Sequence, residues 1–245
     1  MSWDVMQRSV ALERAGRVVP GHVWEPAGCP RSPVVLLGHG GSGSKRAPRI
    51  TRLASWFAGR AGITAAAIDG PFHGDRVTRP LPATEYQQLI ADEGLEQVTK
   101  RMVDDWLLLL AHLSAGGVVD TDRVGYVGLS MGTRFGIPLA AALGTRLRCA
   151  VFGKFGLRQN IPMNPALEDP DLIVSAAQRV TAPIALYVRW DDELFPRSGQ
   201  LELFEAFASV DKVLICRPGS HNGSHGDDEP LWCRFIDRRL RLSSG

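Results

Sequence analysis

The sequence predicts an α/β fold with a doubly wound, mostly parallel sheet. Short apolar runs typical of strands alternate with helix-like segments from residue 33 to the end of the chain. Several of these runs, such as Val34–Leu37, are apolar throughout, as expected for parallel strands that are buried on both faces. Two further strand-like runs precede them and resemble a hairpin, so we expect an antiparallel edge at the N-terminal end of the sheet.

The N-terminal part of the chain is expected to begin with this hairpin and to continue with buried strands and long helices. Residues 13–16 form the predicted hairpin turn. Gly94 interrupts the longest helical region, in which Val98, Met102 and Trp106 mark an apolar face. The predicted elements are strands at 5–12, 17–24, 34–37 and 63–68, a helix at 46–60 and a helical region at 84–114.

The C-terminal part continues the alternation. Pro138 lies inside a predicted helix and should bend it, because proline removes one backbone hydrogen bond. Residues 153–182 form an irregular connection that is too short for a separate cap domain, so we expect no large cap and a fairly open pocket. The predicted elements are strands at 124–129, 149–152, 183–188 and 212–216, and helices at 130–143, 172–179, 200–208 and 230–242.

Length and composition are those of an ordinary globular chain. The 245 residues fit one domain spanning residues 1–245. A formal net charge of +2 does not favour a nucleic acid or an anionic membrane as a partner. No apolar stretch is long enough to span a membrane and the first residues lack a signal-peptide pattern, so we expect a cytoplasmic protein. The oligomeric state stays open.

The cysteines carry no metal or redox signature. Cys29, Cys149, Cys216 and Cys233 are widely separated, and none forms a Cys-x-x-Cys pair. Cys149 and Cys216 lie in apolar runs and are predicted to be small core residues.

The segment Gly128-Leu129-Ser130-Met131-Gly132 is the most informative motif. An apolar strand-like run ends in Gly-x-Ser-x-Gly, and a helix-like segment follows. This is the sequence form of a nucleophile elbow, in which a serine projects from a tight strand-to-helix turn. The two glycines are expected where the backbones of strand and helix nearly touch. The pentapeptide alone is a weak motif, so its context must decide.

Two later strand ends supply the partners that a nucleophilic serine needs. A serine hydroxyl requires a base, and the base requires an orienting acid. Asp191, Asp192 and Glu193 follow the strand at 183–188, and His221 follows the strand at 212–216. Because the carboxyl ends of parallel strands share one edge of a sheet, these groups should lie near Ser130.

With these motifs the chain resembles the α/β-hydrolase family over residues 33–242, and in particular its small carboxylesterases and dienelactone-hydrolase-like members. The resemblance implies Ser130 as nucleophile, His221 as general base and acid, and Asp192 as orienting acid, because in the family the acid commonly stands four residues before a proline, here Pro196. It implies a serine hydrolase that cleaves ester or lactone bonds of small to medium substrates, with no cofactor and no metal.

The resemblance also implies an oxyanion hole and a pocket. The oxyanion donors would be the backbone amides of Met131 and Gly41, with Gly40 close by. His39 mainly braces this loop in the family, whereas His73 could brace a loop or contact substrate. The residues that we expect to border the pocket are His39, Phe72, His73, Phe155, Trp190 and Leu194, together with Lys154, Leu157 and Met163.

Several alternatives stay open. Asp191 or Glu193 could be the acid, and His225 could be the base. A metal site from His221, His225 and the neighbouring aspartates has no familiar ligand spacing, and the glycine loop at 38–43 matches no nucleotide-binding pattern. The same constellation could also serve acyl transfer, thioester hydrolysis or C–C bond hydrolysis. A non-enzymatic receptor is less favoured, because a receptor has no need of an ordered base.

Overall fold

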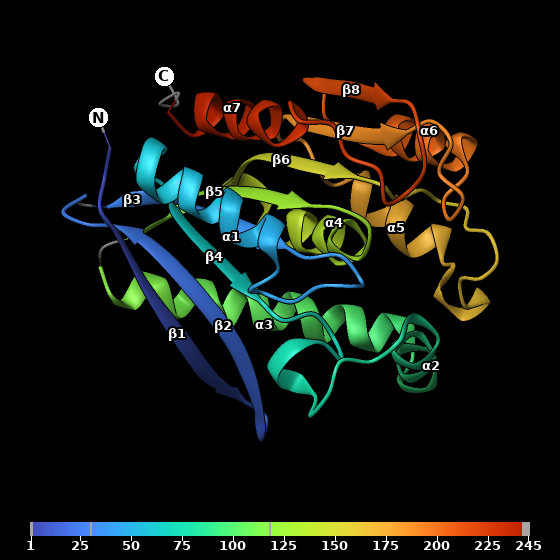
Figure 1. Cartoon of the computed structure of the whole chain (residues 1–245), viewed down its shortest axis with the longest axis horizontal. Coiled ribbons are helices and arrows are strands. Elements are labelled where there is room, and N and C mark those ends of the chain that lie inside the picture. The colour runs from blue at the N-terminus through green and yellow to red at the C-terminus, as the bar shows by residue number, and fades with distance from the viewer. Residues whose placement is uncertain (1, 30, 118, 242–245) are drawn as a thin grey trace.

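The computed structural model describes residues 2–29, 31–117 and 119–241, in which eight strands form one sheet in the order β1-β2-β4-β3-β5-β6-β7-β8 (Figure 1). The strands β3 to β8 pair in parallel, whereas β1 and β2 are antiparallel, so the predicted fold class is confirmed. The strands are β1 (Val5–Arg14), β2 (Arg17–Pro26), β3 (Ser32–Gly38), β4 (Thr64–Ile68), β5 (Val119–Gly128), β6 (Leu147–Gly153), β7 (Ile184–Arg189) and β8 (Lys212–Arg217).

Helices cover both faces of the sheet (Figure 1). Helices α1 and α7 pack on one face, and α3, α4, α5 and α6 supply buried residues to the other. The helices are α1 (Pro48–Trp56), α2 (Ala83–Glu93), α3 (Leu95–Ala115), α4 (Met131–Leu143), α5 (Pro170–Ala177), α6 (Arg197–Ala206) and α7 (Asp228–Arg241). No helix within the described ranges is both long and apolar enough to cross a membrane.

Strand β3 shows how the sheet is buried on two sides. Val34 and Leu36 belong to the core cluster under α3 and α4, whereas Val35 and Leu37 belong to the cluster under α1 and α7. All four side chains are fully buried. The continuous apolar run in the sequence therefore reflects a strand with helices on both faces.

The N-terminal hairpin has a tighter turn than predicted. Ala15 and Gly16 alone connect the strands, with φ angles of 48° and 72°. Such a two-residue turn needs positive φ at both positions, which glycine adopts readily. Strand β2 then pairs antiparallel with β4 and joins the hairpin to the parallel part of the sheet.

Three predicted helical segments differ from the structure in detail. The region at 84–114 is two helices, because Gly94 between α2 and α3 has a φ of 95°. The segment at 46–60 is α1 followed by a π-helical turn at Phe57–Ala61. The C-terminal helix begins at Asp228 rather than Pro230, and Leu242, where we expected it to end, lies outside the described residues.

The prediction for Cys216 was wrong. Cys149 is fully buried in β6, as expected, but Cys216 is exposed. Strand β8 forms the edge of the sheet, so its apolar run covers the core with only part of its side chains. Cys233 on α7 is buried instead. An apolar run does not by itself distinguish an edge strand from a central one.

Candidate active site

Ser130 occupies a sharp turn between β5 and α4. Its φ and ψ are 58° and −119°, a backbone conformation that is unfavourable for any residue other than glycine. A Cβ at Gly132 would lie 2.5 Å from the carbonyl oxygen of Gly38, and one at Gly128 would lie 2.7 Å from the carbonyl oxygen of Gly132. The close approach that we expected at both glycines is therefore confirmed.

Ser130, His221 and Asp192 form a continuous hydrogen-bonded chain. The Nε2 atom of His221 lies 3.1 Å from Oγ of Ser130, and its Nδ1 atom lies 2.8 Å from Oδ2 of Asp192. The other carboxylate oxygen of Asp192 accepts the backbone N–H groups of Leu194 and Phe195, each at 2.9 Å. Asp192 and His221 are both buried. This arrangement can remove a proton from the serine and stabilise the resulting imidazolium.

The rival acids occupy other positions around the same loop. Asp191 accepts the backbone N–H of Gly219 at 2.9 Å, and Glu193 accepts the backbone N–H of His221 at 2.9 Å. Both carboxylates therefore bind the backbone of the loop between β8 and α7 that carries His221, residues 218–227, which we call the histidine loop. Neither carboxylate hydrogen-bonds to the imidazole ring. His225, the rival base, is exposed, and its Nε2 atom lies 3.5 Å from the carbonyl oxygen of Pro218 rather than beside Ser130.

Two buried cations donate hydrogen bonds to backbone carbonyl groups of the histidine loop. The Nε atom of Arg189 donates to the carbonyl oxygen of Ser220 at 3.0 Å. The ammonium group of Lys154 donates to the carbonyl oxygen of Gly223 at 2.7 Å. Burial lowers the pKa of Lys154 to about 8. The loop that presents His221 is thus held on both sides of the histidine.

Gly40, Gly41 and Met131 lie beside Ser130 in the same cavity. The N–H of Met131, as the first residue of α4, has no partner within the helix. A Cβ at Gly41 would lie 2.1 Å from the hydroxyl oxygen of Tyr86, so a larger residue there would have to displace the Tyr86 ring. The positions of these backbone amides are compatible with an oxyanion hole.

His39 and His73 hold the carbonyl groups of this glycine loop. The Nδ1 atom of His39 lies 2.8 Å from the carbonyl oxygen of Gly40, and its Nε2 atom accepts the N–H of Gly70 at 2.7 Å. The Nε2 atom of His73 lies 2.8 Å from the carbonyl oxygen of Gly41. Burial lowers the pKa of His39 to about 4, so its ring is neutral at pH 7. Each bond fixes a peptide plane, and with it the direction of the next N–H.

A buried ion pair lies behind the glycine loop, and the sequence analysis did not anticipate it. The ammonium group of Lys45 bonds to the carboxylate of Asp69, and both side chains are buried. The same carboxylate accepts the backbone N–H groups of Lys45 at 2.9 Å and Asp75 at 2.8 Å. Arg76 donates to the carbonyl oxygen of Asp69 at 2.9 Å. These contacts join the loop after β3 to the loop after β4.

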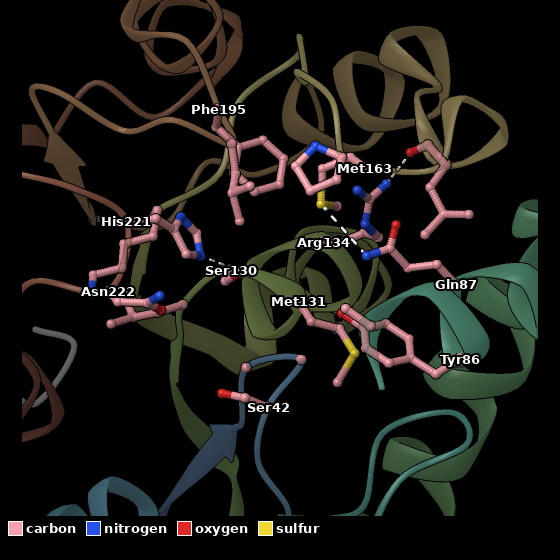
Figure 2. Close-up of a pocket in the computed structure, with 18 of the residues that line it drawn as sticks. Ser42, Tyr86, Gln87, Ser130, Met131, Arg134, Met163, Phe195, His221 and Asn222 are labelled. Atoms are coloured by element: carbon pink, nitrogen blue, oxygen red, sulfur yellow. Dashed lines mark hydrogen bonds between the residues drawn. The ribbon is translucent and has the colours of Figure 1, made fainter. Parts of the chain in front are cut away.

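The cavity over Ser130 has a volume of about 510 Å³ (Figure 2). In Figure 2, His221 and Asn222 lie on one side of Ser130, and Tyr86, Gln87 and Met163 lie on the other. The lining residues are Gly40, Gly41, Ser42, Arg49, Leu81, Pro82, Ala83, Thr84, Tyr86, Gln87, Ile90, Leu129, Ser130, Met131, Arg134, Lys154, Pro162, Met163, Leu167, Leu194, Phe195, His221 and Asn222.

Of the nine residues expected to border the pocket, Leu194, Lys154 and Met163 line this cavity and the other six do not. Phe155 and Leu157 are buried in the layer beneath, where the Phe155 ring packs on Phe195. Trp190 lies outside the cavity, with Arg197 stacked on its ring at 4.1 Å.

The three remaining expectations, for His39, Phe72 and His73, are also corrected. Both histidines face the back of the glycine loop rather than the cavity. The ring of Phe72 lies beneath Arg101, with 5.6 Å between the guanidinium carbon and the ring centre. The first part of the loop after β4, residues 69–76, therefore supports the site without lining it, whereas Leu81 and Pro82 at its end do line the cavity.

Helix α2 and the segment at 157–168 supply much of the cavity wall, of which only Met163 was predicted from the sequence. The backbone N–H of Asn164 donates to the side chain of Gln87 at 2.7 Å, which joins this segment to α2. Arg134 on α4 bonds to the carbonyl oxygen of Leu167 and to the side chain of Gln159. Arg134 stands four residues after Ser130, so helical spacing was the one available signal for it.

Within the described part of the chain, no group of three or more histidine, cysteine or acidic side chains could hold a metal ion. Asp228 is buried and accepts bonds from the hydroxyl group of Tyr187 at 2.5 Å and from Arg217 at 3.2 Å. His225 donates its backbone N–H to the same carboxylate.

No protein-family model and no curated protein matches the chain. Solved structures do match. A PEG-bound complex of a cold-adapted esterase from an Arctic intertidal metagenomic library is 31% identical, with a TM-score of 0.83, covering 98% of this chain and 100% of that one. A dienelactone hydrolase from Anabaena variabilis is 20% identical, with a TM-score of 0.66 and coverage of 96% and 97%. A protein described as a putative dienelactone hydrolase, from Klebsiella pneumoniae, is 16% identical, with a TM-score of 0.74, covering 98% of this chain and 100% of that one. The last two share the fold alone.

Proposed function

The chain belongs to the α/β-hydrolase family together with the esterase to which it is 31% identical, and on that basis we propose that it is a serine hydrolase that cleaves small to medium carboxylic esters or lactones. The observation that carries the proposal is the hydrogen-bonded chain from Ser130 through His221 to Asp192. Such a chain makes a serine nucleophilic at neutral pH.

The proposed reaction begins with attack of Ser130 Oγ on the carbonyl carbon of the substrate. His221 takes the hydroxyl proton on Nε2 as the Oγ–C bond forms, and Asp192 stabilises the imidazolium through Nδ1–H. The imidazolium then gives its proton to the leaving oxygen as the C–O bond breaks. Water attacks the acyl-enzyme by the same route in reverse, and Ser130 recovers its proton.

The oxyanion that develops at the carbonyl would accept the backbone N–H groups of Met131 and Gly41. Backbone donors suit this task because they are already oriented before the charge appears. The bond from His39 to the carbonyl oxygen of Gly40 supports the assignment, since that carbonyl and the N–H of Gly41 share one peptide plane. None of these steps requires a cofactor.

The size of the cavity supports the proposed range of substrates. A volume of about 510 Å³ fits a small to medium ester and is at the lower end of the range for ligand pockets. The cavity wall at 157–168 is anchored to both α2 and α4. We therefore expect poor activity on long-chain triglycerides.

A panel of aryl esters, lactones and thioesters tests the proposal, with the Ser130→Ala variant as control. We expect turnover of esters or lactones by the native protein, with a loss of at least about a thousandfold in the variant. Product analysis with competing alcohols separates hydrolysis from acyl transfer. Folded protein that cleaves none of these substrates, or a variant that retains full activity, would contradict the proposal.

A further inference from the structure

The cavity over Ser130 is lined by cations without any carboxylate. Of the residues that the structure describes, Arg49, Lys154 and Arg134 belong to its wall, and no aspartate or glutamate does. A partly dehydrated cation without a counter-ion is costly, so its partners must be accounted for. The three cations differ in how many hydrogen-bond partners they have.

Arg134 is already engaged. It is buried, it bonds to the carbonyl oxygen of Leu167 and the side chain of Gln159, and it stacks on the ring of Phe155 at 4.9 Å. Its role is accounted for by the contacts that join α4 to the segment at 157–168.

Arg49 is not engaged. It is half-buried in the first turn of α1, and it makes no hydrogen bond or ion pair with any other residue that the structure describes. Burial lowers the pKa of its guanidinium, and the carboxylate that most opposes this lowering is that of Glu229. That carboxylate is taken by Arg52, which holds it through two bonds of 3.0 and 2.6 Å.

Lys154 stands close enough to Arg49 for the two charges to repel each other. It is buried, and its ammonium group has one hydrogen bond, to the carbonyl oxygen of Gly223. Ser42 and Asn222 also belong to the cavity wall, and Lys154 bonds to Gly223, the residue that follows Asn222. We call Arg49, Lys154, Ser42 and Asn222 the cationic corner.

The cationic corner lies on the side of Ser130 that would hold the leaving group. The leaving oxygen must receive its proton from His221, so it lies on the His221 side, whereas the carbonyl oxygen faces Gly41 and Met131. Asn222 follows His221 directly and lies beside it in Figure 2. The opposite side, around Tyr86 and Met163, is mainly apolar and suits an acyl chain.

Building on the proposed function, we propose that the natural substrate is an ester of an apolar acyl group with an alcohol that carries an anionic group, and that Arg49 and Lys154 bind this anion. The carboxylate or phosphate on the alcohol supplies a direct ion-pair partner, which neither cation has among the residues that the structure describes. The chemistry at the ester is unchanged: Ser130 displaces the anionic alcohol, which leaves with the proton from His221.

A matched pair of substrates tests the proposal: meta-butanoyloxybenzoate, with a charged leaving group, and meta-butanoyloxybenzamide, its neutral counterpart. We expect kcat/KM to favour the charged ester by about ten- to a hundredfold, the usual worth of a charge-assisted hydrogen bond. Arg49→Gln should reduce this ratio at least about tenfold, and Arg49→Lys should retain part of it. Arg60→Gln, which removes an exposed charge in the turn that follows the same helix, should leave the ratio unchanged.

A second pair distinguishes the two sides of the cavity. In para-nitrophenyl hydrogen glutarate and para-nitrophenyl methyl glutarate the charge difference lies on the acyl side, and we expect no preference for the charged ester. Preference for the charged acyl group would overturn the proposal while leaving the esterase assignment intact. Equal rates on meta-butanoyloxybenzoate and meta-butanoyloxybenzamide would do the same.

Binding of the product alone separates failure of this inference from failure of the proposed function. Calorimetry should show meta-hydroxybenzoate binding at least about tenfold more tightly than meta-hydroxybenzamide, with the difference lost in Arg49→Gln. If the protein binds the two phenols in this way but cleaves no ester, the anion-binding site is supported and the proposed hydrolase function is refuted. Equal binding of the two phenols by the native protein would refute the anion site.

Discussion

The Nδ1 atom of His221 lies 2.8 Å from Oδ2 of Asp192, although the acids on either side of Asp192 also contact the histidine loop. Asp191 and Glu193 bond to backbone N–H groups, and only Asp192 meets the imidazole ring. The three adjacent carboxylates thus differ in what they can contribute to catalysis.

This difference predicts unequal effects of removing each charge. Asp192→Asn should lower kcat by about a hundred- to ten-thousandfold, because the imidazolium loses its counter-charge and the ring its preferred tautomer. Asp191→Asn, the matched control, should change kcat by less than about tenfold. Steady-state kinetics on one aryl ester compare the two, and equal losses would contradict the assignment of Asp192.

The strained backbone of Ser130 predicts that its removal separates activity from stability. Ser130→Gly and Ser130→Ala both lose the hydroxyl group and should both be inactive. Glycine adopts positive φ without strain, so the glycine variant should be more stable than the alanine variant by about 1 to 2 kcal/mol. Urea unfolding measures this difference, and equal stability would show that the turn is not strained.

Protonation of His39 should weaken the fold in acid. Burial holds the pKa of His39 at about 4, below its ordinary value of 6.5. The folded protein therefore binds fewer protons than the unfolded chain between these values. The stability that neutral His39 contributes is complete above pH 6.5 and is lost as the pH falls through about 4.

Comparison with His39→Asn isolates this effect. Between pH 7 and pH 4 the free energy of unfolding should fall by about 2 to 3 kcal/mol more in the native protein than in the variant. The variant should also lose kcat, because the Gly40 carbonyl is no longer held by the imidazole. Parallel stability curves for the two proteins would contradict this account of His39.

Titration of Lys154 should make the preference for a charged leaving group depend on pH. Burial, with the charges of Arg49 and Arg189, lowers its pKa to about 8, while Asp192 and Asp228 act in the opposite direction. The ammonium charge is therefore lost as the pH rises through about 8.

Accordingly, the ratio of kcat/KM for meta-butanoyloxybenzoate to kcat/KM for meta-butanoyloxybenzamide should decrease as the pH rises from about 7 to about 9. Part of the preference should persist, because Arg49 keeps its charge throughout this range. The neutral ester serves as the internal control, since titration of the proposed base affects both substrates alike. A ratio that is constant with pH would exclude Lys154 from anion binding.

Local sequence patterns were sufficient to predict the fold and to bring Ser130, His221 and a group of three adjacent acids to one edge of the sheet. The alternation of strands and helices gave the correct fold class, and Ser130, Asp192 and His221 follow strand ends that share one edge of the sheet. The choice among three adjacent acids depended on the family resemblance, because a register error of one residue is enough to exchange them. In the structure, the turn at 190–195 decides which carboxylate faces the histidine.

The pocket wall was much harder to predict, for a physical reason. Its residues come from α2 and the segment at 157–168, which meet only through tertiary contacts such as that between Gln87 and Asn164. No pattern near Ser130 encodes which distant segment packs over it. The same limit applies to Cys216, whose exposure depends on β8 being the last strand of the sheet.

Covalent labelling tests the central claim, that Ser130 is an activated nucleophile, most directly. Native protein treated with a fluorophosphonate probe should gain one adduct per chain, and peptide mass spectrometry should locate it on Ser130. Ser130→Ala should remain unlabelled, and His221→Ala should react far more slowly, because its serine lacks a base. Folded native protein that stays unlabelled, or an adduct on a different residue, would contradict the account.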